Sequence, residues 1–249
     1  MNKLTIPTEK IKNYKEIYMI RHGRTKYNEI PMDDWTDCYP SDTPIDFVGE
    51  KQAKKTGKYL RNIAATSGKP YDVIYTSPYT RAFQTSDLIG KENNTTNIVN
   101  VDDIREPYTA GAKSDLKYLK IADDTYNETL AKIKNPIERY SLVNSDVFKH
   151  MFSKELLEKG VIVEEYDKVN DRVDNFIETI KKSPYDKMIV VTHLSILNFL
   201  TKNMFNINTI PYGKISDAGN CAISHVVYDK DADNFHLISP MNNEHLAEL

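Results

Sequence analysis

The sequence has 249 residues, of which 40% are hydrophobic, and this is enough for one large α/β domain with a substantial core. Its 33 basic and 36 acidic residues give a formal net charge of −3, so it has no overall basic character of the kind that nucleic-acid binding requires. Two cysteines, Cys38 and Cys221, are too few for a disulfide framework and match no zinc-binding spacing.

Four short apolar runs predict buried strands of a sheet. They are partly β-branched or aromatic, and each is followed by polar or turn residues, which is more typical of buried strands than of helices. In chain order they cover residues 17–20, 73–75, 98–101 and 188–191. Two later runs, at residues 221–228 and 235–238, are typical of a hairpin or of strands at a sheet edge.

Two predicted helices in the first half of the chain begin at recognisable caps. Residues 47–63 follow Asp46, whose side chain is of a type that caps helix N-termini. Residues 78–89 follow Ser77, and a serine followed by proline is a favourable N-terminal pair. Both segments are therefore expected to be helices that follow strands.

Two further helices are predicted in the second half of the chain. Residues 166–180 carry an apolar stripe at helical spacing, and residues 194–205 are apolar over most of their length. Strands that alternate with helices predict an α/β fold with a mostly parallel sheet flanked by helices on both faces. Residues 107–163 break this alternation with helix-like pieces and no convincing strand, so we expect a helical, cap-like insertion within one domain that spans residues 1–249.

Reactive side chains follow the predicted strands at one edge of the sheet. In open α/β sheets, ligands bind beyond the carboxyl ends of the strands. Histidines, arginines and a carboxylate from distant parts of the chain are therefore expected to meet there. In chain order these residues are Arg21 and His22, Arg81, Arg105 and Glu106, and His193.

These residue types suit phosphoryl transfer. A neutral imidazole is a nucleophile near pH 7, and the planar guanidinium of arginine fits phosphate oxygens while it stays charged. A carboxylic acid whose pKa is raised can protonate the leaving oxygen. Because this reaction mainly needs positioning and charge stabilisation, arginines and a second histidine can supply both without a metal ion.

The same residues resemble the motifs of a known family. Arg21-His22-Gly23, with Asn28 six residues after the histidine, resembles the signature of the histidine phosphatase superfamily (branch 1), which has the phosphoglycerate mutase-like fold. Other blocks follow in the family's order. They are the start of the first helix at residues 43–53, the second arginine motif at residues 76–85, Arg105-Glu106 in the place of the acid, and the second histidine at residues 191–193.

The resemblance implies a phosphatase of the histidine acid phosphatase type that hydrolyses phosphomonoesters. It implies that His22 becomes a phosphohistidine, that Glu106 protonates the leaving group, and that water then hydrolyses the intermediate. It implies no metal ion and no other cofactor. The residues that would hold the phosphate are Arg21, Asn28, Arg81 and His193.

Four departures from the family pattern bear on the choice between hydrolysis and transfer. Arg24 stands where the glycolytic mutases carry an acidic residue, and Leu194-Ser195 stands where many relatives have glycine, so that Leu194 could crowd the pocket. The run after Glu106 also differs from that of the mutases, and the paired arginines that grip their carboxylated substrate are not evident in residues 107–163. These differences favour a phosphatase over a mutase.

Several alternatives remain open. The first is a phosphoglycerate mutase-type phosphotransferase, and the second is a non-catalytic regulatory module that binds phosphate. A metal site built from His22, His193 and Glu106 is disfavoured, because neighbouring arginines would repel a dication. The carboxylates that compete with Glu106 for the place of the acid are Asp102, Asp103, Glu164 and Glu165.

The expected partner is a small phosphorylated substrate, with a phosphoprotein as the alternative. We expect neither nucleic acid nor a membrane as a partner, and the sequence leaves the oligomeric state undetermined. The first residues lack the apolar stretch of a signal peptide, and no apolar run is long enough to span a bilayer. These features favour a cytoplasmic location.

Overall fold

The computed structural model describes most of the chain. The continuous parts are residues 11–28, 42–107, 164–206 and 218–247. The shorter parts are Tyr39–Pro40, Lys113–Ser114 and residues 124–125, 128, 131–132, 154–155 and 158–159.

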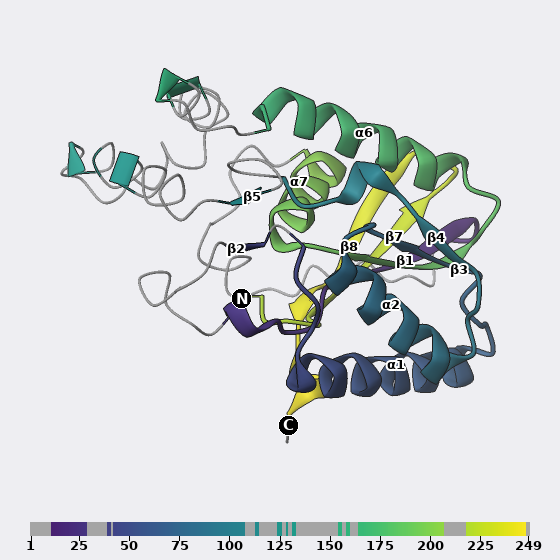
Figure 1. The fold of residues 1–249 in the computed structure, drawn as a ribbon. Helices are drawn as coiled ribbons and strands as arrows, with labels where there is room; N and C mark the ends of the chain where they lie inside the picture. The colour runs from purple at the N-terminus through teal and green to yellow at the C-terminus, as the bar shows by residue number, and fades with distance from the viewer. Residues whose placement is uncertain are drawn as a thin grey trace.

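A six-stranded sheet lies at the centre of these residues, in the order β4-β3-β6-β1-β7-β8 (Figure 1). Its first four strands are parallel to one another, and β7 and β8 form an antiparallel hairpin at the other edge. The predicted mostly parallel sheet and the late hairpin are therefore confirmed. The expectation that residues 98–101 form a buried strand is wrong, because β4 lies at the sheet edge and its residues are half-buried or exposed. The bounds are β1 Tyr14–Arg21, β3 Val73–Thr76, β4 Ile98–Asn100, β6 Lys187–Thr192, β7 Ile223–Asp229 and β8 Asn234–Asn242.

Helices cover both faces of the sheet, as the alternation predicted. The helices α1 (Phe47–Ser67) and α2 (Thr80–Asn93) lie on one face, and α6 (Tyr166–Lys182) and α7 (Leu194–Phe205) lie on the other (Figure 1). Among the residues that the structure describes, no helix is long and apolar enough to cross a membrane.

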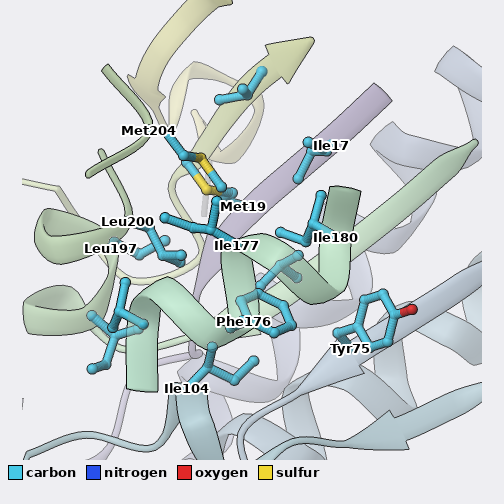
Figure 2. Close-up of a cluster of buried hydrophobic side chains, with 14 of the residues drawn as sticks. Ile17, Met19, Tyr75, Ile104, Phe176, Ile177, Ile180, Leu197, Leu200 and Met204 are labelled. Atoms are coloured by element: carbon cyan, nitrogen blue, oxygen red, sulfur yellow. The ribbon is translucent and has the colours of Figure 1, made fainter. Parts of the chain in front are cut away.

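The apolar strands fill two separate cores because successive side chains of a strand point to opposite faces. In β1, Ile17 and Met19 join the core beneath α6 and α7, whereas Tyr18 and Ile20 join the core beneath α1 and α2. Phe176 of α6 is fully buried in the first core (Figure 2). A strand that is buried on both faces needs a continuous apolar run, and this is why its sequence was recognisable.

The predicted cap of α1 is confirmed, whereas that of α2 is wrong. The carboxylate of Asp46 accepts hydrogen bonds from the amides of Val48 and Gly49. The helix α2 begins only at Thr80, whose amide donates to Asp42 instead, over 2.6 Å. Within the described parts of the chain, the hydroxyl of Ser77 accepts only from the amide of Tyr79, the residue before the helix, over 3.3 Å, and its other contact is with His193.

The described residues between β4 and α6 include a short strand that the sequence did not reveal. Lys113–Ser114 (β5) pairs antiparallel with Tyr39–Pro40 (β2), so the expectation of no strand in residues 107–163 is wrong. Two residues are too few to show an alternating pattern. The helix-like pieces expected there fall largely outside the described residues, and the cap-like insertion stays a prediction.

Candidate active site

Parallel pairing of β1 with β6 brings two histidines together. Arg21 is paired with Thr192, and the amide of His22 donates to the carbonyl of Thr192 over 2.9 Å. His22 and His193 thus leave adjacent strand ends, and their ring centroids are 5.2 Å apart. Both side chains are buried, with exposed fractions of 5% and 1%.

The ring of His22 is held by its own neighbour. Its Nδ1 atom lies 2.8 Å from the carbonyl oxygen of Gly23. A carbonyl only accepts hydrogen bonds, so Nδ1 carries the proton and Nε2 keeps a lone pair. Burial, followed by the charges of Arg81 and Arg21, lowers the pKa of His22 well below 6.5. The imidazole is therefore neutral near pH 7.

The turn after His22 packs tightly against the start of α1. A Cβ atom on Gly23 would lie 2.8 Å from the carbonyl oxygen of Gly49, so this position has no room for a side chain. The Gly23 amide donates to Thr85 of α2, and the Arg24 amide donates to Gln52 of α1. Gly23, Gly49 and Gln52, which all lie in the motif blocks, thus help to fix the backbone that carries His22.

Arg24 is anchored to the same helix start. Its Nε atom donates to Oδ2 of Asp46 over 2.9 Å, and both side chains are roughly one-fifth exposed, at 22% and 23%. The arginine that departs from the mutase pattern thus contacts the residue that caps α1.

His193 is held by a serine from a different strand. Its Nε2 atom lies 2.8 Å from Oγ of Ser77, at the end of β3. Its Nδ1 atom is buried and has no hydrogen-bond partner among the described residues. Burial and then Arg81 lower the pKa of His193 well below 6.5. This histidine is also neutral near pH 7.

Two arginines lie at the same edge. Arg81, in the first turn of α2, is 4% exposed, and its guanidinium lies 5.1 Å from the ring centroid of Tyr79. The Nη1 atom of Arg21 donates to the carbonyl of Ala218 over 2.7 Å. Their charges lower the pKa of both histidines. A buried arginine is disfavoured at the positive N-terminal end of a helix, and an anion bound there would compensate it.

Glu106 lies near these arginines. Its Oε1 atom accepts a hydrogen bond from Oγ of Ser195 over 2.7 Å, while Oε2 is buried without a partner among the described residues. Burial raises the pKa of Glu106 above 4.5, and this shift is opposed by the Ser195 hydrogen bond and by Arg81 and Arg21. A carboxyl with a raised pKa next to arginine cations is suited to proton donation.

Glu164, one of the competing carboxylates, belongs to an ion-pair network. It accepts hydrogen bonds from both Nη atoms of Arg105 and from Nε and Nη2 of Arg172, at 2.9–3.1 Å. The side chain of Glu164 is 5% exposed. Arg105, which follows β4, is therefore bound in this network.

The other competing carboxylates lie in different surroundings. The side chains of Asp102 and Glu165 are 76% and 54% exposed. Burial raises the pKa of Asp103, and the charged neighbours that influence it are Arg172, Asp102 and Arg105. Arg81 and Arg21 both influence the pKa of Glu106, whereas neither is among the charged neighbours that influence that of Asp103.

Asn28 shapes the loop of His22. It is exposed, and its Oδ1 atom accepts from the amide of Thr25 over 2.9 Å and from Nδ2 of Asn220 over 3.2 Å. Asn220 also donates to the carbonyl of His22. The structure thus places Asn28 beside the loop of His22. Its role as a phosphate ligand, through Nδ2, stays a prediction.

Three residues at the site were missed or misread from the sequence. Ser77 was expected to cap a helix, Ser195 was noted only as a departure from glycine, and Asn220 gave no signal. Each acts through a contact with a residue more than 80 positions away, which no local pattern reveals. Within the described parts of the chain, no group of three or more histidine, cysteine, aspartate or glutamate residues is arranged to hold a metal ion.

Comparison with known proteins identifies the family. Residues 17–239 match the family model of the histidine phosphatase superfamily (branch 1). The chain is 32% identical to the uncharacterized phosphatase PhoE of Bacillus subtilis over 91 residues, which cover 36% of this chain and 41% of that protein. It is 27% identical to the protein named "Putative phosphoserine phosphatase 2" of Hydrogenobacter thermophilus over 184 residues, which cover 72% of this chain and 73% of that protein.

A solved structure shares the fold. The phosphoglycerate mutase of Bacillus anthracis superposes with a TM-score of 0.71 at 18% sequence identity, over 96% of this chain and 98% of that one. The six-stranded α/β sheet is thus that of the phosphoglycerate mutase-like fold. The family match and the phosphatase relatives support an activity of the phosphatase or mutase type. The chain belongs to the histidine phosphatase superfamily, branch 1.

Proposed function

We propose that this protein is a metal-independent phosphatase of the histidine acid phosphatase type that hydrolyses phosphomonoesters through a phosphohistidine on His22. The observation that carries the proposal is the hydrogen bond from Nδ1 of His22 to Gly23, because it leaves a lone pair on Nε2 of a neutral, buried ring. Nearby arginines supply the positive charge that attracts a phosphate to this nitrogen.

The reaction has two steps. In the first, Nε2 of His22 bonds to phosphorus as the bond between phosphorus and the ester oxygen breaks, and Glu106 gives its proton to that oxygen. In the second, the Glu106 carboxylate takes a proton from water, the water oxygen bonds to phosphorus, and His22 is released as inorganic phosphate forms. Arg21, Arg81 and His193 bind the phosphate oxygens in both steps, and Asn28 is a further ligand.

Hydrolysis is preferred to transfer because the sequence departs from that of the mutases at two places. The segment after Glu106 lacks the run that the mutases carry, and Arg24 replaces their acidic residue. The charge of Arg24 is paired with Asp46, which ties it to α1. We propose a small phosphorylated substrate or a phosphoprotein, a cytoplasmic location, and no requirement for a metal ion or cofactor.

An assay with nitrophenyl phosphate tests the proposal. The purified protein is assayed with and without EDTA, next to His22→Ala and to His236→Ala, a matched histidine change in β8. We expect turnover that EDTA leaves intact, that His22→Ala abolishes and that His236→Ala preserves. Loss of activity in EDTA would exclude the metal-free mechanism, and activity in His22→Ala would exclude His22 as the nucleophile. Isomerisation of phosphoglycerate without hydrolysis of the aryl ester would assign the protein as a mutase.

A further inference from the structure

Ser195 makes a contact that none of the site predictions included. It lies in the first turn of α7, two residues after His193, and its hydroxyl donates to Oε1 of Glu106 over 2.7 Å. The two residues are 89 positions apart in the sequence. The hydroxyl thus joins the helix that follows the second histidine to the carboxyl group near the arginines.

The backbone amide of Ser195 reinforces this contact. The first hydrogen bond within α7 runs from the amide of Leu197 to the carbonyl of His193, so the amides before Leu197 have no acceptor within the helix. The amide of Ser195 is one of these, and it acts on the carboxyl group of Glu106 by lowering its pKa. Ser195 thus favours the charged form of Glu106 from the positive end of a helix, while its hydroxyl makes the hydrogen bond.

The backbone beneath Glu106 is fixed independently of Ser195. The hydroxyl of Thr192 donates to the carbonyl of Ile104 over 2.6 Å, and Arg105 is bound by Glu164. The position of the main chain is thus set by β6 and by the ion-pair network. What remains to be set is the orientation of the Glu106 side chain, and in the described residues Ser195 is its hydrogen-bond partner.

We propose that Ser195 is the positioning residue of the proton donor: it holds Oε1 of Glu106, so that Oε2 carries the proton that passes to the leaving group. This inference rests on the proposed phosphatase function and extends it to a residue at which the chain departs from its relatives. The unpartnered, buried Oε2 atom is the oxygen left for the proton.

The chemistry of the first step explains why a donor at Oε1 is useful. When the proton leaves Oε2 for the ester oxygen, negative charge develops on the carboxyl group as the bond between His22 and phosphorus forms. The Ser195 hydroxyl donates to that charge, and hydrogen bonds to charged groups are stronger than those between neutral groups. Ser195 therefore stabilises the product of proton transfer more than its reactant, which makes Glu106 a better acid in the transition state.

The dependence on the leaving group separates this role from a purely structural one. An alkyl phosphate needs its leaving oxygen protonated, whereas nitrophenolate leaves with little help from an acid. We expect Ser195→Ala to lower kcat/KM roughly tenfold for an alkyl phosphate and less than about threefold for nitrophenyl phosphate. Ser195→Thr, which keeps the hydroxyl, should restore the alkyl activity. Thr201→Ala removes a hydroxyl elsewhere on α7, where it bonds to the carbonyl of Leu197, and should affect neither substrate.

The titration of Glu106 gives a second readout that needs no turnover. The groups whose charge or hydrogen bonding acts on its carboxyl are Ser195 from α7, Arg81 from α2 and Arg21 from β1, while His22 and His193 titrate nearby. Loss of the Ser195 donor removes a bond that favours the carboxylate, so the pKa of Glu106 should rise further. NMR of the glutamate carboxyl carbons, with the Glu106 signal assigned from Glu106→Gln, measures the change.

The outcomes distinguish this inference from the proposed function. An equal loss on both substrates with an unchanged Glu106 titration, or no loss on either, would overturn the role of Ser195 while leaving His22 as the nucleophile. If the wild-type protein turns over neither ester, the phosphatase assignment fails. The Glu106 titration then still decides whether Ser195 acts on the carboxyl, and a titration identical in Ser195→Ala would reject it.

Discussion

Nδ1 of His22 lies 2.8 Å from the carbonyl oxygen of Gly23, the residue that follows it in the chain. Because the acceptor is a carbonyl, the bond fixes the tautomer as well as the orientation of the ring. The glycine is required for a separate reason, since a side chain there would collide with the carbonyl of Gly49. One short turn thus determines which nitrogen of His22 keeps a lone pair.

The site of phosphorylation on the ring follows from this geometry. Phosphoenzyme trapped by rapid quenching during turnover should carry the phosphate on Nε2 of His22, and phosphorus NMR distinguishes this isomer from phosphate on Nδ1. His22→Ala should trap none, and His236→Ala should trap as much as the wild type. Phosphate on Nδ1 would show that the ring reacts in another orientation.

The pH dependence of activity follows from two shifts of opposite sign. In the proposed mechanism His22 must be neutral to react. Burial and Arg81 hold its pKa well below 6.5, so the rise of kcat/KM with pH should lie below pH 6.5. Glu106 must be protonated, and burial raises its pKa, so activity should fall again at a pH above 4.5. The measurement is kcat/KM against pH, calculated from the concentration of the dianionic substrate. This correction is needed because phosphate esters themselves titrate at about pH 6.

Glu106→Gln tests the assignment of the alkaline limb. Glutamine does not titrate, so this limb should disappear while the acidic limb stays in place. An acidic limb centred at or above pH 6.5 in the wild type would contradict the lowered pKa of His22.

The bond between Ser77 and His193 predicts a loss of phosphate binding. Ser77→Ala would leave Nε2 of His193 buried without its partner, and the ring would lose the contact that orients Nδ1. We expect inorganic phosphate to inhibit about tenfold more weakly, the factor that corresponds to roughly 1.4 kcal/mol. Ser86→Ala is the matched control, since this buried serine bonds only locally, to the carbonyl of Ala82. Equal inhibition of Ser77→Ala and the wild type would show that Ser77 does not orient His193.

The fold could largely be predicted because its signals are local. The continuous apolar runs of β3 and β6 predict strands that are buried between two helical layers. Asp46 directly precedes α1 in the sequence and predicts where that helix begins. Parallel pairing then places the residues after β1 and β6 side by side, so the meeting of His22 and His193 also follows from the sequence.

The finer contacts of the candidate site could not be predicted, because they depend on how separate elements pack. Ser77 looked like a helix cap, and only the pairing of β3 with β6 directs it to His193. Ser195 departs from the family pattern, but the sequence did not indicate its contact with Glu106. That contact depends on how α7 packs against the segment after β4. The two-residue pairing of β2 with β5 was hidden because it is shorter than any sequence period.

The ion-pair network beside Glu106 predicts unequal effects from two adjacent glutamates. Glu164 is 5% exposed and pairs with both Arg105 and Arg172, so Glu164→Gln removes a buried carboxylate that two guanidiniums share. Breaking such a buried pair from one side costs about 3–5 kcal/mol of the free energy of unfolding. Glu165→Gln should cost less than about 1 kcal/mol, because its pair with Lys168 is exposed.

Urea unfolding of the two variants measures this difference, and their kinetics add a second comparison. Arg105 directly precedes Glu106, so the network could stabilise the fold alone or could also position the acid. Activity measured below the unfolding transition distinguishes these two roles. If the network positions Glu106, the folded Glu164→Gln protein should lose more activity on an alkyl phosphate than on nitrophenyl phosphate. A loss confined to stability would mean that Thr192 and Ser195 are sufficient to hold the acid in place.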